Sequence, residues 1–457
     1  MSVIGNGIYI GGSGGGGGGS GEEDALVMRT ISQYTNSRVS YIGSYAFYLC
    51  STLTSAAFPA CKFIENHAFG TCSGLESISF PACESIDMWA FDRCGKLTSV
   101  NFPSCTSIGS SAFALCYSLA TAVFPVCTTI ETSAFGGDNN LTSISFPSCE
   151  NIGTFAFAQC TSLTSANFPA CTSIRDAAFS NCYRLTSANF PACTSIGNSA
   201  FQSCRALTSI SCSACTSIGN SAFQHCFALT SVSFPVCTRI GNAAFQSCSA
   251  FTSISFPVCI TIGSNAFRDC KALTSISFPV CTTIGNNAFV NCSSLTSASF
   301  PVCSSVGEYL FQYCSALTAV YAPMFPRINA STFQYCYKLA YANFPLVTGI
   351  FGNAFQSCSS LTWVSFPMCS SIWGVAFSGC FNLLSVYLLG SSVATLLNIN
   401  AFSSTPIAGY TASTGGVYGS IFVRASLLAA WQSKQNWSYF SSRFVGLTDA
   451  EIEALGE

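Results

Sequence analysis

The stretch LTSISFPVCTTIGNNAFVNCSS, Leu273–Ser294, contains the pattern that decides the fold. Its Ala-Phe pair, or a close variant, returns every 22 residues from Phe47 to Phe377, at sixteen positions without an insertion or deletion. A fixed period of this length is typical of a solenoid, in which each repeat forms one coil and the stacked coils share one core. We therefore predict a continuous stack of 22-residue coils.

Each coil is expected to contain one strand and one tight turn. Leu273–Phe278 is rich in β-branched and aromatic residues, and Pro279 ends it because proline cannot donate to a ladder. Gly285 and Asn286 indicate a corner, and Asn287–Cys292 is expected to form a short 3₁₀ or helical turn. Stacking then gives a parallel β-sheet on one face and short helical turns on the other, with caps over both open ends.

The 29 cysteines follow the repeat in two ladders, one containing Cys281 and the other Cys292. Phe325 and Val347 stand in the first of these ladders where cysteine is missing, so that position requires an apolar filler. Asp138 interrupts the second ladder. Free cysteine packs like a small hydrophobic residue, and a uniform ladder does not need pairing. The pattern therefore favours buried, reduced thiols over disulfides.

The sequence predicts neither a metal site, nor a cofactor, nor an enzyme. Zinc sites usually combine closely spaced cysteines with histidines, whereas these cysteines lie 11 residues apart and the only histidines are His67 and His225. The two histidines fall in loop positions about seven coils apart, without an acidic partner in the pattern, so a catalytic triad or dyad is not expected. We expect His67 to lie on the solvated surface.

Charge and hydropathy exclude two classes of partner. With 16 Lys and Arg, 18 Asp and Glu, and a net charge of -2, the chain lacks the basic footprint of a nucleic-acid-binding protein. No apolar run approaches the roughly 18 to 20 residues of a membrane-spanning helix, so membrane insertion is not expected. The N-terminus has neither the basic segment nor the compact apolar segment of a Sec signal peptide.

Composition divides the chain into four segments. Residues 1–21 are predicted to be an anchoring peptide followed by a Gly-rich flexible tether. Residues 22–37 form an N-terminal cap, residues 38–405 the repeats, and residues 406–457 a C-terminal capping module. In that module we expect a strand at 421–423, a helix near 426–435, and a small core of four aromatic residues: Trp431, Trp437, Tyr439 and Phe444.

The pattern LxxIxFPxCxxIGxxAFxxC resembles the BspA-like (Treponema pallidum-type) leucine-rich repeats over residues 38–405. The segment after the repeats resembles the terminal module that follows them in that family. The resemblance implies a leucine-rich-repeat solenoid. The family includes surface adhesins and phage proteins, so the resemblance implies a role of one of these kinds. Chains whose N-terminal region is similar to this one resemble phage-borne proteins.

The outward strand positions carry Ser, Thr or Asn in most coils, but four aromatic residues take these places in the last coils: Tyr321, Tyr341, Trp363 and Tyr387. Tyrosine and tryptophan are enriched at recognition hot spots and stack on sugars. The sequence therefore predicts a ligand-binding patch. The alternative is that the C-terminal module or a neighbouring subunit covers these rings.

Together these observations favour a non-enzymatic recognition rod. The leading hypothesis is an adhesin-like or receptor-binding component of a phage or virion-like particle, held through residues 1–21 and contacting a host-surface protein or glycan. A bacterial cell-surface adhesin is the first alternative, and a structural protein that self-assembles into a fibre or shell is the second. The expected location is a virion or an extracellular surface, and the pattern leaves room for a homo-oligomer.

Overall fold

The computed structural model describes residues 3–4, 7–8 and 31–455. The chain divides into two compact units, Met1–Phe234 and Pro235–Glu457, here called the first and the second unit. Strands β1 (Val3–Ile4) and β2 (Gly7–Ile8) pair antiparallel near the N-terminus. The rest of the expected tether, and the expected cap up to residue 30, lie outside the described residues.

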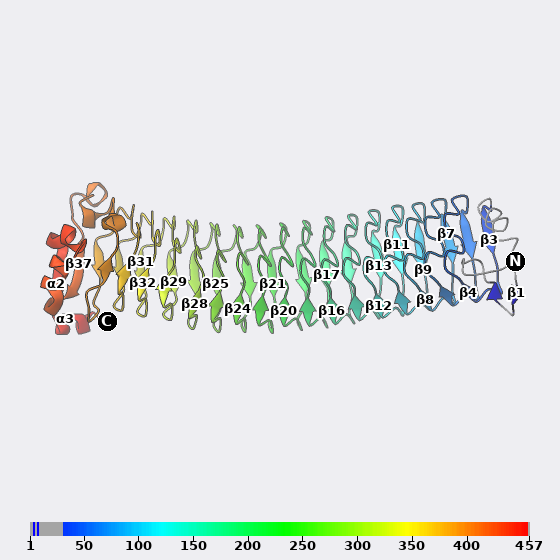
Figure 1. Cartoon of the computed structure of the whole chain (residues 1–457), viewed down its shortest axis with the longest axis horizontal. Coiled ribbons are helices and arrows are strands. Elements are labelled where there is room, and N and C mark those ends of the chain that lie inside the picture. Colours follow the sequence, from blue (N-terminus) through cyan, green and yellow to red (C-terminus); the bar gives the residue numbers. More distant parts are fainter. Residues whose placement is uncertain (1–2, 5–6, 9–30, 456–457) are drawn as a thin grey trace, which may run out of the picture. The chain divides into compact units, whose positions relative to one another are not determined.

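Each coil contributes two short strands, and where strands of successive coils pair within the repeats they run parallel, almost always with partners 22 residues apart. In the coil quoted above, β25 (Ser275–Ser277) pairs with β27 (Ser297–Ser299), and β26 (Thr283–Ile284) pairs with β28 (Ser305–Val306). Figure 1 shows the strands of successive coils side by side within each unit. The predicted solenoid is confirmed, and the second strand adds a ladder that the sequence did not indicate.

In the first unit, the first strands of the coils form three-stranded sheets with the orders β3-β5-β7, β9-β11-β13 and β15-β17-β19. The first strands are β3 (Gln33–Thr35), β5 (Ser55–Ala57), β7 (Ser77–Ser79), β9 (Ser99–Asn101), β11 (Thr121–Val123), β13 (Ser143–Ser145), β15 (Ser165–Asn167), β17 (Ser187–Asn189), β19 (Ser209–Ser211) and β21 (Ser231–Ser233). The second strands are β4 (Tyr41–Ile42), β6 (Phe63–Ile64), β8 (Ser85–Ile86), β10 (Ser107–Ile108), β12 (Thr129–Ile130), β14 (Asn151–Ile152), β16 (Ser173–Ile174), β18 (Ser195–Ile196) and β20 (Ser217–Ile218).

In the second unit, the first strands continue with the same spacing up to the C-terminal module. They are β23 (Ser253–Ser255), β25, β27, β29 (Ala319–Tyr321), β31 (Tyr341–Asn343), β33 (Trp363–Ser365) and β35 (Ser385–Tyr387). The second strands are β22 (Arg239–Ile240), β24 (Thr261–Ile262), β26, β28, β30 (Arg327–Ile328), β32 (Gly349–Ile350), β34 (Ser371–Ile372) and β36 (Thr395–Leu396).

The side of the coil opposite the strands consists of tight turns and differs from the expected 3₁₀ or α turn. Asn287 and Asn291 have left-handed φ angles of 59° and 60°. This geometry turns their backbone N–H groups toward the next coil, where they donate to the carbonyls of Glu308 and Gln312 at 2.8 Å. A continuous helical turn would direct these N–H groups along its own axis, so the left-handed residues convert the turns into a third ladder.

Phenylalanine columns fill the core. Phe289 is fully buried and stacks on Phe267 of the preceding coil with ring centroids 5.4 Å apart, while Phe278 packs against it at 6.2 Å in a tilted arrangement. Burying one such ring contributes roughly 1.5–3 kcal/mol, and a favourable ring pair adds about 0.5–1.5 kcal/mol. The Phe289 column is complete from Phe47 to Phe377, and the Phe278 column is present in most coils, so stability grows with the number of coils.

All 29 cysteines are buried and free, as the ladders predict. They also bond to the backbone: the Cys292 thiol donates to the Phe267 carbonyl at 3.2 Å, and the Cys281 thiol donates to the Thr283 carbonyl at 3.4 Å. Thiols of both ladders therefore fill space and also give backbone carbonyls a weak donor.

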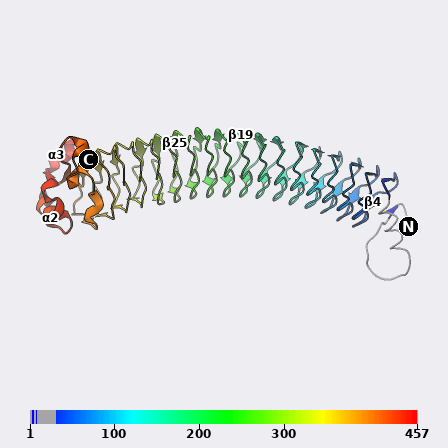
Figure 2. The same cartoon turned by 90° about the horizontal axis from the view of Figure 1, so that it is seen from above.

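The C-terminal module lies against the last coils of the second unit, as both views show (Figures 1 and 2). Its elements are η1 (Ile399–Phe402), η2 (Pro406–Ala408), η3 (Ala412–Thr414), β37 (Ser420–Arg424), η4 (Ala425–Leu427), α2 (Leu428–Ser433), η5 (Trp437–Arg443), β38 (Phe444–Leu447) and α3 (Asp449–Ala454). Strand β37 extends the first-strand ladder by pairing in parallel with β35, and β38 follows it.

The expected core of this module is correct for three of its four aromatic residues. Trp431, Trp437 and Phe444 are buried and in ring contact, and the Trp437 indole N–H donates to the Ala394 carbonyl at 2.9 Å. The prediction is wrong for Tyr439, which is 73% exposed. Tyr439 and Phe440 are adjacent in η5, and it is Phe440 that turns inward, onto Phe402 of the preceding segment.

Candidate binding surface

The four predicted aromatic residues lie in two lanes on the outer face of the first strands. Tyr341 and Trp363 are direct cross-strand partners in one lane. Tyr321 and Tyr387 belong to the other lane, where their neighbours along the ladder are Ser299 and Ser365. The two lanes arise because successive residues of a strand alternate between its faces, so outward positions are two residues apart.

Tyr341 and Trp363 form one aromatic platform. Their rings stack 5.5 Å apart with an interplanar angle of 11°, and they remain 45% and 36% exposed. Tyr321 is more open still, at 61%. Such exposure of flat, nearly parallel rings on a polar strand face fits a recognition surface, because the rings offer contact area with few rotatable bonds.

Tyr387 is partly covered by the C-terminal module. Its ring stacks on Phe422 of β37 at 4.6 Å with an interplanar angle of 12°, and this is its cross-strand partner. For this residue the alternative interpretation, packing against the module, holds in part. Phe422 itself did not emerge from the sequence, because the insertion before β37 hides its place in the 22-residue register.

A pocket of about 510 Å³ opens beside Tyr341, lined also by Tyr321, Ser299, Asn343 and Pro323 among others. It lies where two sheets meet, since β29 ends the sheet β25-β27-β29 and β31 begins the sheet β31-β33-β35-β37-β38.

A local exchange of residue sizes accompanies this break. Ala322 stands where other coils carry the phenylalanine of the FP pair, and Phe325 stands where they carry the following cysteine. The ring of Phe325 enters the core from the new position, 6.0 Å from Phe344. The strand edge beside Tyr321 thus has a small inward side chain where most coils have a phenylalanine.

A second pocket, of about 270 Å³, lies on the other side of the platform and is lined by Trp363, Ser385, Tyr387 and Leu455. The four predicted residues are therefore brought together in pairs, with Tyr321 and Tyr341 at one pocket and Trp363 and Tyr387 at the other. Among the residues that the structure describes, neither lining includes a charged side chain, and the polar side chains are hydroxyl groups together with the Trp363 indole and the Asn343 amide. The exposed rings and hydroxyl groups suit a ligand with apolar faces and hydroxyl groups.

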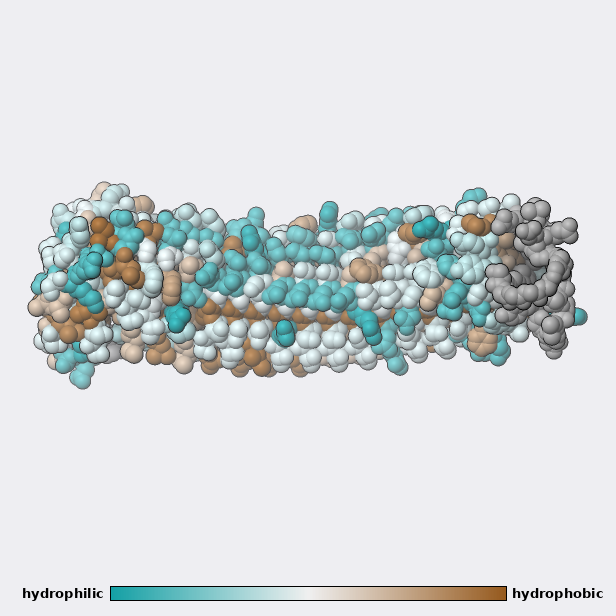
Figure 3. All heavy atoms as spheres, viewed as in Figure 1, coloured by the Kyte–Doolittle hydropathy of each residue, from teal (hydrophilic) through white to brown (hydrophobic). Residues whose placement is uncertain are grey.

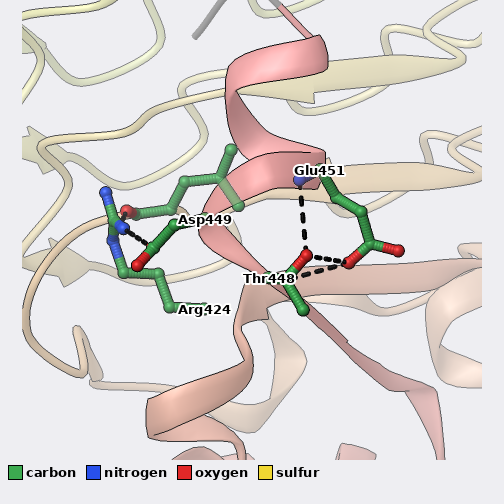
Figure 4. A network of polar contacts seen from close by, with 5 residues as sticks. Arg424, Thr448, Asp449 and Glu451 are labelled. Carbon is green, nitrogen blue, oxygen red and sulfur yellow. Dashed lines mark hydrogen bonds and ion pairs between the residues drawn. The ribbon is translucent and has the colours of Figure 1, made fainter.

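Leu455, which lines the second pocket, directly follows α3, and polar contacts fix the start of this helix (Figure 4). The Thr448 hydroxyl accepts from the Glu451 N–H at 3.3 Å, while the Glu451 carboxylate accepts from the Thr448 N–H at 2.8 Å, so the two residues form a capping box. The Thr448 N–H bond holds the pKa of Glu451 below its usual range. Arg424 pairs with Asp449 at 2.5 Å and ties the helix to β37.

A second exposed aromatic cluster lies in the first unit and did not emerge from the sequence. The His67 ring stands between the rings of Tyr45 and Trp89, with centroids 4.8 Å from each, and Tyr48 meets it edge-on. His67 is therefore covered on both ring faces but is only half-buried, so the expectation of a solvated surface histidine is correct only in part. Tyr45, His67 and Trp89 hold the same left-handed position in three successive coils, so alignment of the repeats reveals the column.

Within residues 3–4, 7–8 and 31–455, no group of three or more His, Cys, Asp or Glu side chains is placed to hold a metal ion. The same residues include no helix whose length and hydropathy would let it span a membrane.

The family of the chain follows from its repeats. The model of the BspA type leucine rich repeat region matches residues 40–148, 128–250, 238–362 and 326–415, which together cover most of the sequence. The chain belongs to this family. Such repeats typically form binding proteins without catalytic activity. No curated protein matches the chain.

Solved structures of bacterial leucine-rich repeat proteins are similar to the chain. A leucine-rich repeat protein from Bacteroides ovatus is 24% identical, covering 79% of this chain and 87% of that one, with a TM-score of 0.48. A leucine rich cell surface protein from Faecalibacterium prausnitzii is 25% identical over 68% and 83% of the two chains, with a TM-score of 0.40. The T. pallidum leucine rich repeat protein is 25% identical over 38% and 78%, with a TM-score of 0.29.

Proposed function

We propose that this BspA-type protein is a non-enzymatic adhesin that binds a neutral ligand on a cell surface through the aromatic patch Tyr321, Tyr341, Trp363 and Tyr387. The observation that carries the proposal is the exposed, stacked Tyr341–Trp363 pair with a pocket on each side whose described lining residues are uncharged. Ring faces stack on sugar rings, and the neighbouring serines and Asn343 supply hydroxyl and amide groups for hydrogen bonds.

Of the two locations considered for a recognition protein, a cell surface and a phage particle, we propose the cell surface. The phage version rests on residues 1–21, most of which lie outside the described residues. The family match concerns the repeats alone and contains no phage component. Antibody labelling of intact producing cells, compared with labelling of particles released into the medium, separates the two locations.

The binding test uses an array of neutral and charged glycans together with a panel of extracellular matrix proteins. We expect Trp363→Ala or Tyr341→Ala to weaken binding by about 2 kcal/mol, or roughly thirtyfold, because each removes half of the platform. The control is Tyr439→Ala, since Tyr439 is an exposed ring of the second unit outside the patch. If Trp363→Ala and Tyr341→Ala bind as tightly as Tyr439→Ala and the wild type, the patch is not the binding site. If the wild-type protein binds only matrix proteins and no glycan, the ligand is a protein.

A further inference from the structure

A continuous row of exposed apolar side chains follows the corner between the two strands of the coil in the second unit. Each member comes directly after the proline that ends a first strand, and the members are 22 residues apart. All are between 39% and 57% exposed. We call them the corner row: Val236, Val258, Val280, Val302, Met324, Leu346 and Met368.

The fold itself does not require large apolar residues at this corner. The equivalent positions of the first unit carry small residues except at Val126: Ala60, Ala82, Ser104, Val126, Ser148, Ala170, Ala192 and Ala214. The coils there have the same strands and the same buried columns. The second unit thus exposes seven consecutive larger aliphatic side chains without a structural need, and Figure 3 shows apolar residues lined up along its coils on the face in view.

The corner row is large enough to matter for association. Seven side chains of this size, each about two-fifths exposed, present on the order of 400 Å² of apolar surface before the proline rings beside them are counted. Soluble monomers rarely expose larger patches, and a standard interface buries about 800 Å² on each partner. The row therefore supplies about half of one side of a stable interface.

Charge is absent from the middle of the row. The corners and second strands of three successive coils, 257–263, 279–285 and 301–307, contain no charged residue. Exposed arginines occur on the second strands on either side of this stretch, at Arg239 and Arg327. Covering the middle of the row therefore buries no charge, which removes the main cost of burying such a surface.

We propose that the corner row is the interface of a homodimer, in which two copies of this chain lie antiparallel about a two-fold axis at Val302. Full overlap of the seven positions then pairs Val236 with Met368, Val258 with Leu346, and Val280 with Met324, each in both directions. Val236, Val258 and Val280 thereby each meet a larger side chain, and Val302 meets its own equivalent at the axis, so the bulk is distributed symmetrically along the interface. A parallel pair would place Val on Val and Met on Met, leaving space at one end and crowding at the other.

The arginines fix the same register. With the axis at Val302, Arg239 faces Ser371 of the second copy and Arg327 faces Thr283. A shift of the axis by one coil, to Val280, would place Arg239 opposite Arg327 and bring like charges together. The occupant is a second copy because only a chain with the same coil spacing, about 4.8 Å per step, matches the row coil by coil.

Sedimentation velocity over a concentration series of the full chain tests the interface. We expect a dimer, and an increase of its dissociation constant by at least tenfold in Val280→Ala/Val302→Ala, which introduces the residue that Ala170 and Ala192 already show to be tolerated. Val126→Ala is the matched control, since Val126 has the same corner position and 42% exposure but stands alone in the first unit. A monomeric wild-type chain, or a dimer that the double variant leaves unchanged, would overturn the proposal.

Cross-linking with a short bismaleimide tests the orientation, because all native thiols are buried. Val302→Cys should form cross-linked dimers with itself, whereas Val236→Cys should do so only when mixed with Met368→Cys. Self-cross-linking of Val236→Cys at the rate of Val302→Cys would overturn the antiparallel arrangement. The dimer is independent of the aromatic patch. Trp363→Ala should leave dimer formation unchanged, and the corner variants should leave ligand binding by the patch unchanged.

Discussion

The backbone N–H of Cys116 donates to the Oδ1 of Asp138 at 2.8 Å inside a fully buried core. Asp138 stands where the neighbouring coils carry Cys116 and Cys160, so one carboxyl group replaces one thiol in an otherwise regular column. Its other oxygen, Oδ2, has no hydrogen-bond partner. Burial raises the pKa of Asp138 well above its usual range, because a charged carboxylate would lose its hydration without an adequate replacement.

This buried carboxyl group predicts a specific dependence of stability on pH. The folded-state pKa of Asp138 lies above the unfolded value of about 4. The protonated carboxyl group therefore makes its full contribution to the unfolding free energy below pH 4, and this contribution is lost as the pH rises through the folded-state pKa. We expect Asp138→Asn, which keeps the oxygen that accepts from Cys116, to be stabilising relative to the wild type at neutral pH. The difference should shrink by up to about 1.4 kcal/mol per pH unit on acidification.

Urea unfolding of both proteins between pH 4 and pH 8 measures this difference, and Asp138→Cys, which restores the ladder, should behave like Asp138→Asn. Taking the difference between variant and wild type removes contributions from other titrating groups, such as Asp92, whose pKa burial also raises. If the difference in unfolding free energy between variant and wild type stays constant from pH 4 to pH 8, the pKa of Asp138 is not raised by folding, and the prediction fails.

The C-terminal module predicts opposite outcomes for two aromatic residues close in sequence. Trp437 is buried against Trp431 and Phe444 and donates its indole N–H to Ala394, so Trp437→Ala should cost about 3–5 kcal/mol of unfolding free energy. Tyr439→Ala should change it by less than about 0.5 kcal/mol, because the side chain is 73% exposed. Thermal unfolding followed by circular dichroism compares the two, and equal losses would contradict the described packing.

These two residues also show where sequence reasoning succeeds and where it ends. Inside the repeats, the column through Phe289 and Cys292 is predictable because sixteen copies fix which positions face inward. The C-terminal module has no second copy, so nothing in the sequence distinguishes the inward Phe440 from the outward Tyr439. Which side chains face the core is therefore predicted by their position in the 22-residue repeat and not by residue type.

The candidate site divides in the same way. The outward positions of Tyr341 and Trp363 follow from strand alternation, and the structure agrees. The pocket beside them could not be predicted, because it lies at a break between two first-strand sheets, and the 22-residue repeat does not indicate where such breaks fall. The left-handed backbone at Asn287 escaped prediction since it follows from hydrogen bonding between coils and not from a glycine.

The buried thiols predict low chemical reactivity. Burial raises the pKa of Cys61 to about 11 and that of Cys127 to about 12, and the thiolate is the reactive form. In the native protein at pH 8, we expect fewer than one thiol per chain to react rapidly with Ellman's reagent, against all 29 in denaturant. Reducing agent should leave the melting temperature unchanged because no cysteine is paired. Rapid native labelling of several thiols would show that the core opens frequently.

The glycines at the corners of the coils lie so close to the backbone of the preceding coil that a larger residue should be destabilising there. A Cβ at Gly285 would lie 2.5 Å from the Ser264 nitrogen and 2.8 Å from the Gly263 carbonyl carbon, both backbone atoms of the preceding coil. Gly285→Ala must therefore push two coils apart, and we expect it to lower the unfolding free energy by about 1–3 kcal/mol. Gly352→Ala is the control, because a Cβ there meets no atom within 4 Å. Chemical unfolding of both variants should separate them clearly, and a Gly285→Ala protein as stable as Gly352→Ala would mean that the corner relaxes without cost.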